Sequence, residues 1–197
     1  GSVGRIPDSL TTVFHTAAGR EVRDGGGVSP DIEVKQERLP NILYYLVRDN
    51  LIFDYATDYC LKHPVIASAE KFELTDADYT DFKNKVKGAD FKYDQQSEKI
   101  LKTLKEAAEF EGYMKEASDE FKALENKLSH NLDRDLDYFS KDIKEMISEE
   151  IIKRYYYQRG AIIQQLKGDN ELDEAVKILT NPERYQQILS VTATEKK

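Results

Sequence analysis

Two pairs of residues have the types needed for a nucleophile and its base: the hydroxyl of Ser9 with the amine of Lys35, and the thiol of Cys60 with the imidazole of His63. Such a pair works when nucleophile and base share a hydrogen bond and a third group orients the base. Cys60 and His63 are three residues apart and would share a helix face. Nothing in the sequence supplies an orienting group or an oxyanion hole, so the pattern favours packing roles for this pair.

Alternating carboxylates at Asp133, Asp135 and Asp137 resemble the start of a calcium loop. That loop requires Gly at its sixth position and Glu at its twelfth, where this chain has Tyr138 and Lys144. Alternating Asp at a helix start also serves capping and complements the helix dipole. The single cysteine and three dispersed histidines offer no ligand spacing either. We therefore predict no metal site.

Three consecutive glycines, Gly25–Gly27, resemble part of a phosphate-binding loop, but such a loop ends in Gly-Lys-Ser/Thr and opens a helix. Here Pro30 follows, in a segment that reads as extended. The sequence therefore predicts a structural turn and no nucleotide or other cofactor.

The overall charge excludes two classes of partner. The formal net charge of the 197 residues is −8, whereas nucleic-acid binding and attraction to anionic membranes need a basic surface. No apolar run approaches the ~20 residues of a membrane span. We expect no nucleic-acid partner and no membrane insertion.

The glycines concentrate in a turn-rich stretch at the front of the chain, where six of the ten occur within the first 27 residues. Two extended runs, Thr12–Thr16 and Arg20–Arg23, flank Ala17-Ala18-Gly19, which is typical of a β-hairpin. A second turn leads to Pro30, whose ring fixes one backbone angle and removes a hydrogen-bond donor.

Two short elements of this stretch resemble the carboxyl-terminal processing (tail-specific) peptidases, a family of secreted or periplasmic serine endopeptidases. Their Thr-x-x-Gly-Arg and Gly-(Ile/Val)-x-Pro-Asp elements match Thr16, Gly19 and Arg20, then Gly27, Val28, Pro30 and Asp31. The match covers roughly 14–34. The extra glycines and the lack of a Pro-Ser before Gly19 suggest a divergent branch.

The resemblance implies a catalytic Ser with a Lys base, both upstream of these elements. Only thirteen residues precede Phe14, so we expect the dyad to lie outside this chain, which would be inactive alone. Whether a PDZ-type domain precedes the dyad is left open. Ser9 and Lys35 straddle the motif in the wrong order and receive no catalytic role. Arg20 and Asp31 are expected to pair with each other or to position the active-site strands.

Helical patterns dominate after Pro40. We expect a helix up to His63, a helix from Asp76 capped by Thr75, and short helices after Glu171 and Asn181. Apolar stripes predict a helix of some thirty residues from Ile100 and a second long helix from Leu132 to Leu166, with Gly160 a kink. The two would pair as an antiparallel hairpin, with a coiled coil between chains as the alternative.

The predicted fold is mostly α within the α+β class: a short β-hairpin region and a helical bundle with two long antiparallel helices. Residues 1–37 would belong to the peptidase core, 38–191 would form a helical domain, and 192–197 a disordered tail. The Tyr155–Tyr157 run must turn at least one ring outward.

The sequence therefore predicts the C-terminal region of a periplasmic or extracytoplasmic serine endopeptidase that acts on proteins or peptides. This region would have a structural, substrate-gating or assembly role, and self-association is left open. The alternative is a non-enzymatic helical adaptor whose hairpin only mimics the motif.

Overall fold

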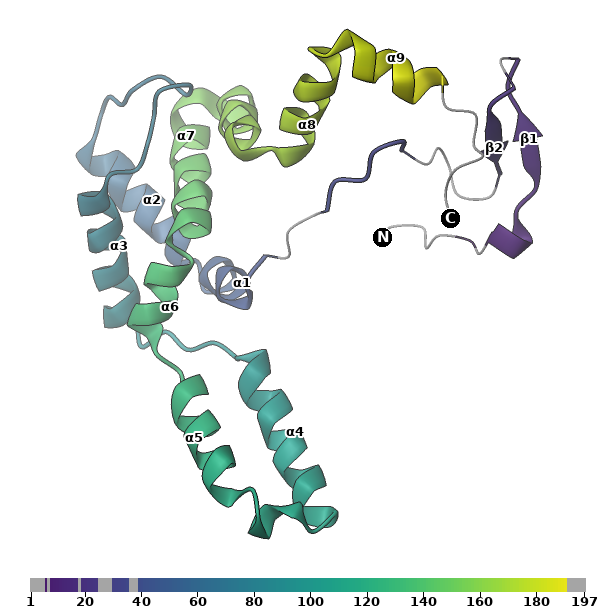
Figure 1. Ribbon diagram of the computed structural model, residues 1–197. Helices are drawn as coiled ribbons and strands as arrows, with labels where there is room; N and C mark the ends of the chain where they lie inside the picture. The colour runs from purple at the N-terminus through teal and green to yellow at the C-terminus, as the bar shows by residue number, and fades with distance from the viewer. Residues whose placement is uncertain (1–5, 7, 18, 25–29, 36–38, 191–197) are drawn as a thin grey trace. The chain divides into compact units, whose positions relative to one another are not determined.

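A computed structural model describes residues 6, 8–17, 19–24, 30–35 and 39–190. The chain divides into two compact units, one of residues 1–36 with 169–197 and the other of residues 37–168. In the described part, a two-stranded antiparallel hairpin precedes nine α-helices, which confirms the mostly α, α+β class (Figure 1). The predicted disordered tail, 192–197, lies outside the described residues.

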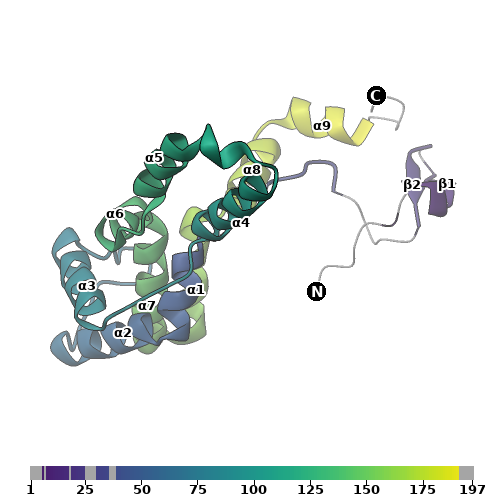
Figure 2. The ribbon, with the colours of Figure 1, turned by 90° about the horizontal axis from the view of Figure 1, so that it is seen from below.

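The core of the larger unit is built by five helices: α1 (Asn41–Arg48), α2 (Leu51–Lys62), α3 (Asp76–Gly88), α6 (Leu132–Tyr138) and α7 (Ser140–Gln165). Their apolar positions recur every three or four residues, so each helix presents a stripe to its neighbours. The most extensive contact joins α2 to α7 (Figures 1 and 2). Leu46, Phe82, Ile147 and Ile151 are completely buried.

The expected single helix up to His63 is divided into α1 and α2. Asn50, between them, adopts a left-handed backbone with φ 58°. Asn is one of the few residues other than Gly that visits this region routinely. The break turns α2 so that Ile52, Tyr55 and Ala56 also reach the core.

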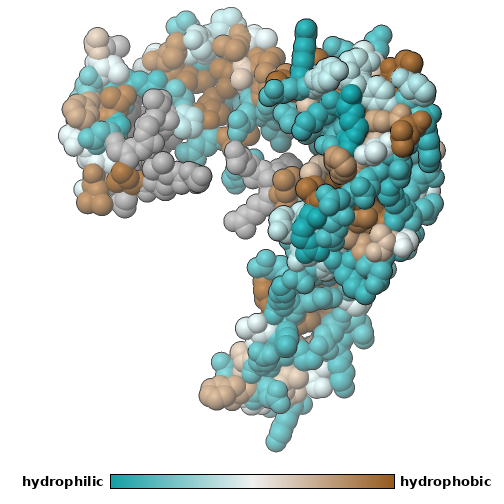
Figure 3. All heavy atoms as spheres, turned by 180° about the vertical axis from the view of Figure 1, so that it is seen from behind, coloured by the Kyte–Doolittle hydropathy of each residue, from teal (hydrophilic) through white to brown (hydrophobic). Residues whose placement is uncertain are grey.

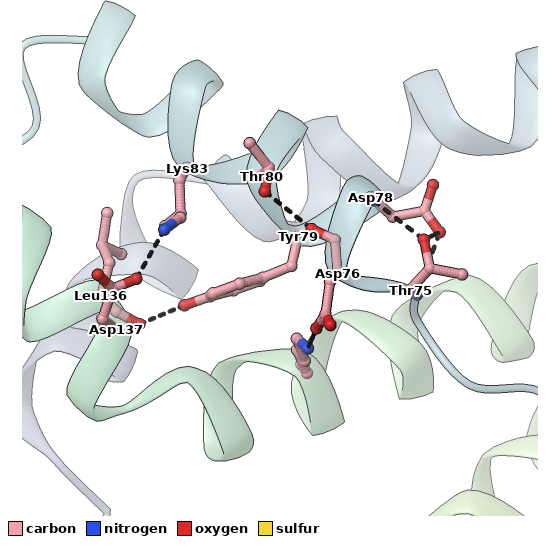
Figure 4. Close-up of polar contacts among 9 residues, drawn as sticks. Thr75, Asp76, Asp78, Tyr79, Thr80, Lys83, Leu136 and Asp137 are labelled. Carbon is pink, nitrogen blue, oxygen red and sulfur yellow. Dashed lines mark hydrogen bonds and ion pairs between the residues drawn. The ribbon is translucent and has the colours of Figure 1, made fainter.

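The predicted cap of α3 is confirmed as a complete capping box. The Thr75 hydroxyl accepts from the Asp78 N–H at 3.1 Å, and the Asp78 carboxylate accepts from the Thr75 N–H at 3.2 Å. One residue further on, the hydroxyl of Tyr79 donates to the carbonyl of Leu136 (Figure 4). The cap thus fixes where α3 begins, and Tyr79 fastens it to α6.

The structure corrects the expected thirty-residue helix from Ile100. This region is a helical hairpin made of α4 (Gln96–Phe110), the 3₁₀ turn η2 (Tyr113–Lys115) and α5 (Ser118–Leu128). Gly112 ends α4 with φ 86°, which costs glycine no Cβ clash. The hairpin projects from the rest of its unit (Figures 1 and 2), and we call it the arm. The apolar residues of α4 therefore pack against those of α5. The second long helical region does not pair with them as expected, because α7 packs on α2.

The second long stripe is also divided. α6 and α7 meet at Phe139, and α7 contains a non-helical residue, Tyr157, with φ 54° and ψ −155°. The break therefore lies three residues before Gly160, the expected kink. Gly160 is nevertheless needed for packing, because a Cβ there would lie 2.8 Å from Cγ2 of Ile152 and collide with Cβ of Tyr156. The turn η3 (Leu166–Gly168) ends the unit.

The other unit contains η1 (Asp8–Leu10), β1 (Val13–His15), β2 (Glu21–Arg23), α8 (Asn170–Leu179) and α9 (Pro182–Ser190). Asp169 caps α8 by accepting from two backbone N–H groups of the first turn, and Asn181 caps α9 by accepting from the N–H of Arg184. None of the described helices combines the length and apolarity needed to cross a membrane.

Candidate functional site

The candidate site is the β1–β2 hairpin with the segment that follows it. The strands pair with His15 opposite Glu21. Thr16 closes the turn: its N–H donates to the carbonyl of Arg20 at 2.9 Å, its carbonyl accepts from the N–H of Gly19 at 2.9 Å, and its hydroxyl accepts from the N–H of Arg20 at 3.1 Å. Gly19 has φ 81°, a region that glycine adopts at no steric cost. The Thr and Gly of the first motif element thus build this turn.

An ion pair joins the first motif element to the second. A terminal guanidinium nitrogen of Arg20 contacts Oδ1 of Asp31, and the two side chains keep 32% and 40% of their surface exposed. The structure therefore realises one of the two arrangements expected for these residues. Pro30 lies immediately before Asp31 and restricts the approach of the chain. Gly27 and Val28, also predicted to belong to the motif, lie outside the described residues.

Apolar side chains of the hairpin remain in contact with solvent. Val13, Phe14 and Val22 are 39%, 53% and 42% exposed. A two-stranded hairpin is at best marginally stable by itself, and its edges are open to further strands. These three apolar side chains of the hairpin are therefore only partly covered within the described part of the chain.

Cys60 and His63 have packing contacts. Nδ1 of His63 lies 2.9 Å from the carbonyl oxygen of Tyr59, and the two rings stack with centroids 4.0 Å apart. The Tyr155 hydroxyl donates to the carbonyl of His63, and burial, with contacts to Cys60, raises the pKa of that hydroxyl to about 12. Ser9 and Lys35 are both exposed, and no contact between them occurs in the described part of the chain.

The three alternating aspartates of α6 face three different partners. Asp133 pairs with Lys87, and Asp137 pairs with Lys83 at 2.6 Å (Figure 4). Within the described residues, no group of three or more His, Cys, Asp or Glu side chains is placed to hold a metal ion. The aspartates anchor α6 to its neighbours.

Asp135 has a structural role that the sequence reasoning missed. Its side chain is buried, and Oδ2 accepts from the Tyr93 hydroxyl at 2.6 Å and from Nε2 of Gln95 at 2.7 Å. The Tyr93 ring also meets the ring of His130 edge to face. Burial first, then the bond to Asp135, raises the pKa of Tyr93. One signal was present, since Asp135 lies three residues after Leu132 on the apolar stripe of α6.

A polar pocket of about 290 Å³ lies between α2 and α3. An ion pair of 2.5 Å between Lys85 and Asp58 crosses it and holds the pKa of Asp58 below its usual range. The remaining wall carries tyrosines and charges of both signs: Tyr55, Tyr59, Lys62, His63, Asp78 and Asp81. This is a surface pocket without a nucleophile held by a base.

Comparison with known proteins gives one match. A family model described as "Probable PDZ-protease, C-terminal helical domain" matches residues 42–179, from α1 to the end of α8. The match excludes the hairpin, so the strand–turn elements and the helical match are independent observations. No curated protein and no solved structure matches the chain.

Proposed function

The chain belongs to the family of C-terminal helical domains of probable PDZ-proteases, and from this premise we propose that it is the non-catalytic C-terminal region of a serine endopeptidase of the carboxyl-terminal processing class. In this proposal a Ser nucleophile and its Lys base are contributed by a preceding segment of the same protein. The substrates are proteins or peptides cleaved near their C-termini, in the periplasm or another extracytoplasmic compartment.

The observation that carries the proposal is the connection of the two motif elements. Thr16 and Gly19 shape the turn, and Arg20 reaches Asp31 across the intervening glycine-rich segment. This single Arg–carboxylate contact holds the two elements close to each other. A hairpin held in this way can set the position of a neighbouring active-site strand without touching substrate.

The exposed strands support the same proposal. Phe14 and Val22 are half exposed in the described hairpin, so a sheet of the catalytic core would bury them and satisfy the open strand edges. The helical unit forms its own core of nineteen buried residues. The two parts therefore have separate tasks: the hairpin completes the catalytic core, and the helices form an appended domain.

The test uses the intact peptidase that contains this chain. Replacing Arg20→Ala should lower kcat/KM for a peptide substrate at least about tenfold, equivalent to about 1.4 kcal/mol of transition-state stabilisation. Glu33→Ala, at an exposed position of the same segment, is the matched control and should stay within about twofold. Thermal unfolding of the helical domain should be the same in both variants.

Two results would overturn the proposal. One is unchanged proteolysis in Arg20→Ala. The other is proteolysis by residues 1–197 alone that disappears when a residue within them is replaced. An intact protein without a Ser/Lys pair before the hairpin would favour the non-enzymatic adaptor instead.

A further inference from the structure

The arm has an apolar side that no described part of the chain covers. Only Leu101 and Ala108 are buried in α4, and α5 buries no residue. Ile100, Leu104 and Leu124 remain 59%, 51% and 40% exposed. Figure 3 shows such hydrophobic patches within the mostly hydrophilic surface of the arm. When two helices pack only on each other, the apolar residues at the outer edge of each apolar face stay exposed to solvent.

This apolar side lies beside a groove on the arm whose lining mixes charged residues with Leu101 and Leu128. The groove is lined by charged positions of α4, including Lys102, Glu106 and Glu109, and by Asn126 of α5. Leu104 and Leu124 do not line this groove, although Leu101 and Leu128, each about one turn away on the same helix, do. The exposed leucines therefore form an apolar flank of the arm beside the groove.

Charge is distributed unevenly along the arm. The base, residues 96–105 and 122–129, carries five lysines and two glutamates, a net charge of +3. The tip, residues 106–121, carries six acidic residues and one lysine, a net charge of −5. The same order of charges occurs around Leu124 on α5. Glu120 lies about one turn from Leu124 toward the tip, and Lys127 lies about one turn from it toward the base, so the three residues share one face of the helix.

We propose that the apolar side of the arm binds the same side of a second copy of this chain, in antiparallel orientation. The acidic tip of each arm then lies on the basic base of the other, and Leu104 and Leu124 meet at the centre. Such an interface is isologous, because a two-fold axis places each contact twice. The product is a four-helix bundle made from two helical hairpins.

The arm is small, and its size sets the strength of the dimer. α4 has 15 residues, about 22 Å at 1.5 Å per residue, and two helices about 10 Å wide give a side of roughly 450 Å². Both copies together would bury about 900 Å², below the 1,200–2,000 Å² of stable complexes. We expect a dissociation constant in the micromolar range that rises with salt, since the charges are exposed.

The inference goes beyond the proposed function and does not depend on it, because dimerisation is measured on the chain without proteolysis. Analytical ultracentrifugation over about 5–500 μM should show a monomer–dimer equilibrium. The variants Lys127→Glu and Glu120→Lys should each raise the dissociation constant about tenfold or more, because each places like charges together twice. Neither side chain forms an ion pair among the described residues.

The double variant, Lys127→Glu with Glu120→Lys, should restore dimerisation, because the antiparallel contact pairs the exchanged charges again. In a parallel pair each of these side chains would meet its own copy, so neither single variant would weaken the dimer in the way expected here. Leu104→Glu should abolish the dimer, whereas Leu61→Glu, an exposed leucine of α2, should not. Circular dichroism checks that each monomer stays helical.

Three results would overturn the inference: a monomer throughout the concentration range, a dimer indifferent to Leu104→Glu, or no rescue in the double variant. Proteolytic activity of the intact protein affects none of these readings.

Discussion

Asp135 shows how a single side chain can join two parts of the helical unit. Its carboxylate lies in α6, while Tyr93 and Gln95 precede α4 at the base of the arm. His130, from the other connection of the arm, lies against the Tyr93 ring. One buried carboxylate therefore holds the incoming connection to the arm next to the helix that follows it. A buried carboxylate of this kind is stable only while its hydrogen bonds are complete.

Asp135→Ala should lower the free energy of unfolding by about 2 kcal/mol, because two half-buried donors lose their charged, buried acceptor. Asp137→Ala is the matched control, since Asp137 lies in the same helix, is 63% exposed and pairs only with Lys83 among the described residues. It should cost no more than about 1 kcal/mol. Urea unfolding followed by circular dichroism measures both. Equal losses would show that Asp135 is not a special anchor.

Gly160 illustrates a close approach within one helix. Gly160→Ala should cost about 1–3 kcal/mol, because the new methyl group would overlap Tyr156 and Ile152. Gly88→Ala provides the comparison: nothing lies within 4 Å of a Cβ there, so the change should be neutral or slightly stabilising. Thermal melts measure the change in stability of each variant. If Gly160→Ala is neutral, α7 relaxes easily at Tyr157 and the close approach is not needed.

At the scale of elements, the arm and α7 differ in how they obtain their stability. α7 is surrounded by the core, where Ile143, Ile147 and Ile151 are completely buried. α4 and α5 have mainly each other, linked by Leu101, Ala108 and a 2.5 Å ion pair between Lys105 and Glu125. Local opening of the arm should therefore require less free energy than opening of the core.

Gly112→Ala should destabilise the arm by about 1–2 kcal/mol, since Gly112 has φ 86° and a residue with a Cβ is strained there. Gly112→Asn should cost less, because Asn tolerates this backbone. Hydrogen exchange should quicken in residues 96–129 for the Ala variant and stay unchanged in α2 and α7. Equally faster exchange throughout the unit would contradict an arm that opens by itself.

At the scale of the whole molecule, several tyrosines make stability sensitive to alkaline pH. Burial raises the pKa of Tyr55, Tyr79 and Tyr93 above that of a free tyrosine, and that of Tyr155 to about 12. The unfolded chain loses these protons near pH 10, whereas the folded chain keeps them. Their contribution is thus fully present below about pH 10 and is lost as the pH rises through the folded-state values.

We therefore expect the free energy of unfolding to fall above about pH 10, by up to about 1.4 kcal/mol per pH unit for each tyrosine that stays protonated. Tyr79→Phe should be less stable at pH 8, because the bond to Leu136 is lost, but should show a shallower decline between pH 10 and 12. Tyr157→Phe, at a position 78% exposed, should keep the wild-type decline. Identical declines in all three proteins would contradict the assignment.

The family match confirms, at the level of the whole molecule, the interpretation of the chain as the C-terminal portion of a peptidase. The resemblance rested on residues of the hairpin, and the match rests on the helices. Agreement between separate regions is stronger support than either alone. The roles of Gly19, Arg20 and Asp31 beside an active site stay a prediction.

Features that depend only on neighbours along the chain could be predicted from the residues. The hairpin follows from Gly19 and its flanking extended residues, the start of α3 from Thr75 and Asp78, and the start of α9 from Asn181. Capping and turn chemistry act over three or four residues, so local reading suffices. The apolar periodicity likewise predicted which stretches become helical.

The points where the long apolar stripes break, and the helices that pair, depend on the packing of the folded chain. One apolar repeat fits either a single helix of some thirty residues or two helices folded back at Gly112, because the repeat does not record chain direction. The choice depends on the burial available to each arrangement, and here α2 covers α7 while α4 and α5 cover each other. The role of Asp135 could not be predicted from the sequence for a related reason. Its partners lie about forty residues away along the chain and contact it only after folding.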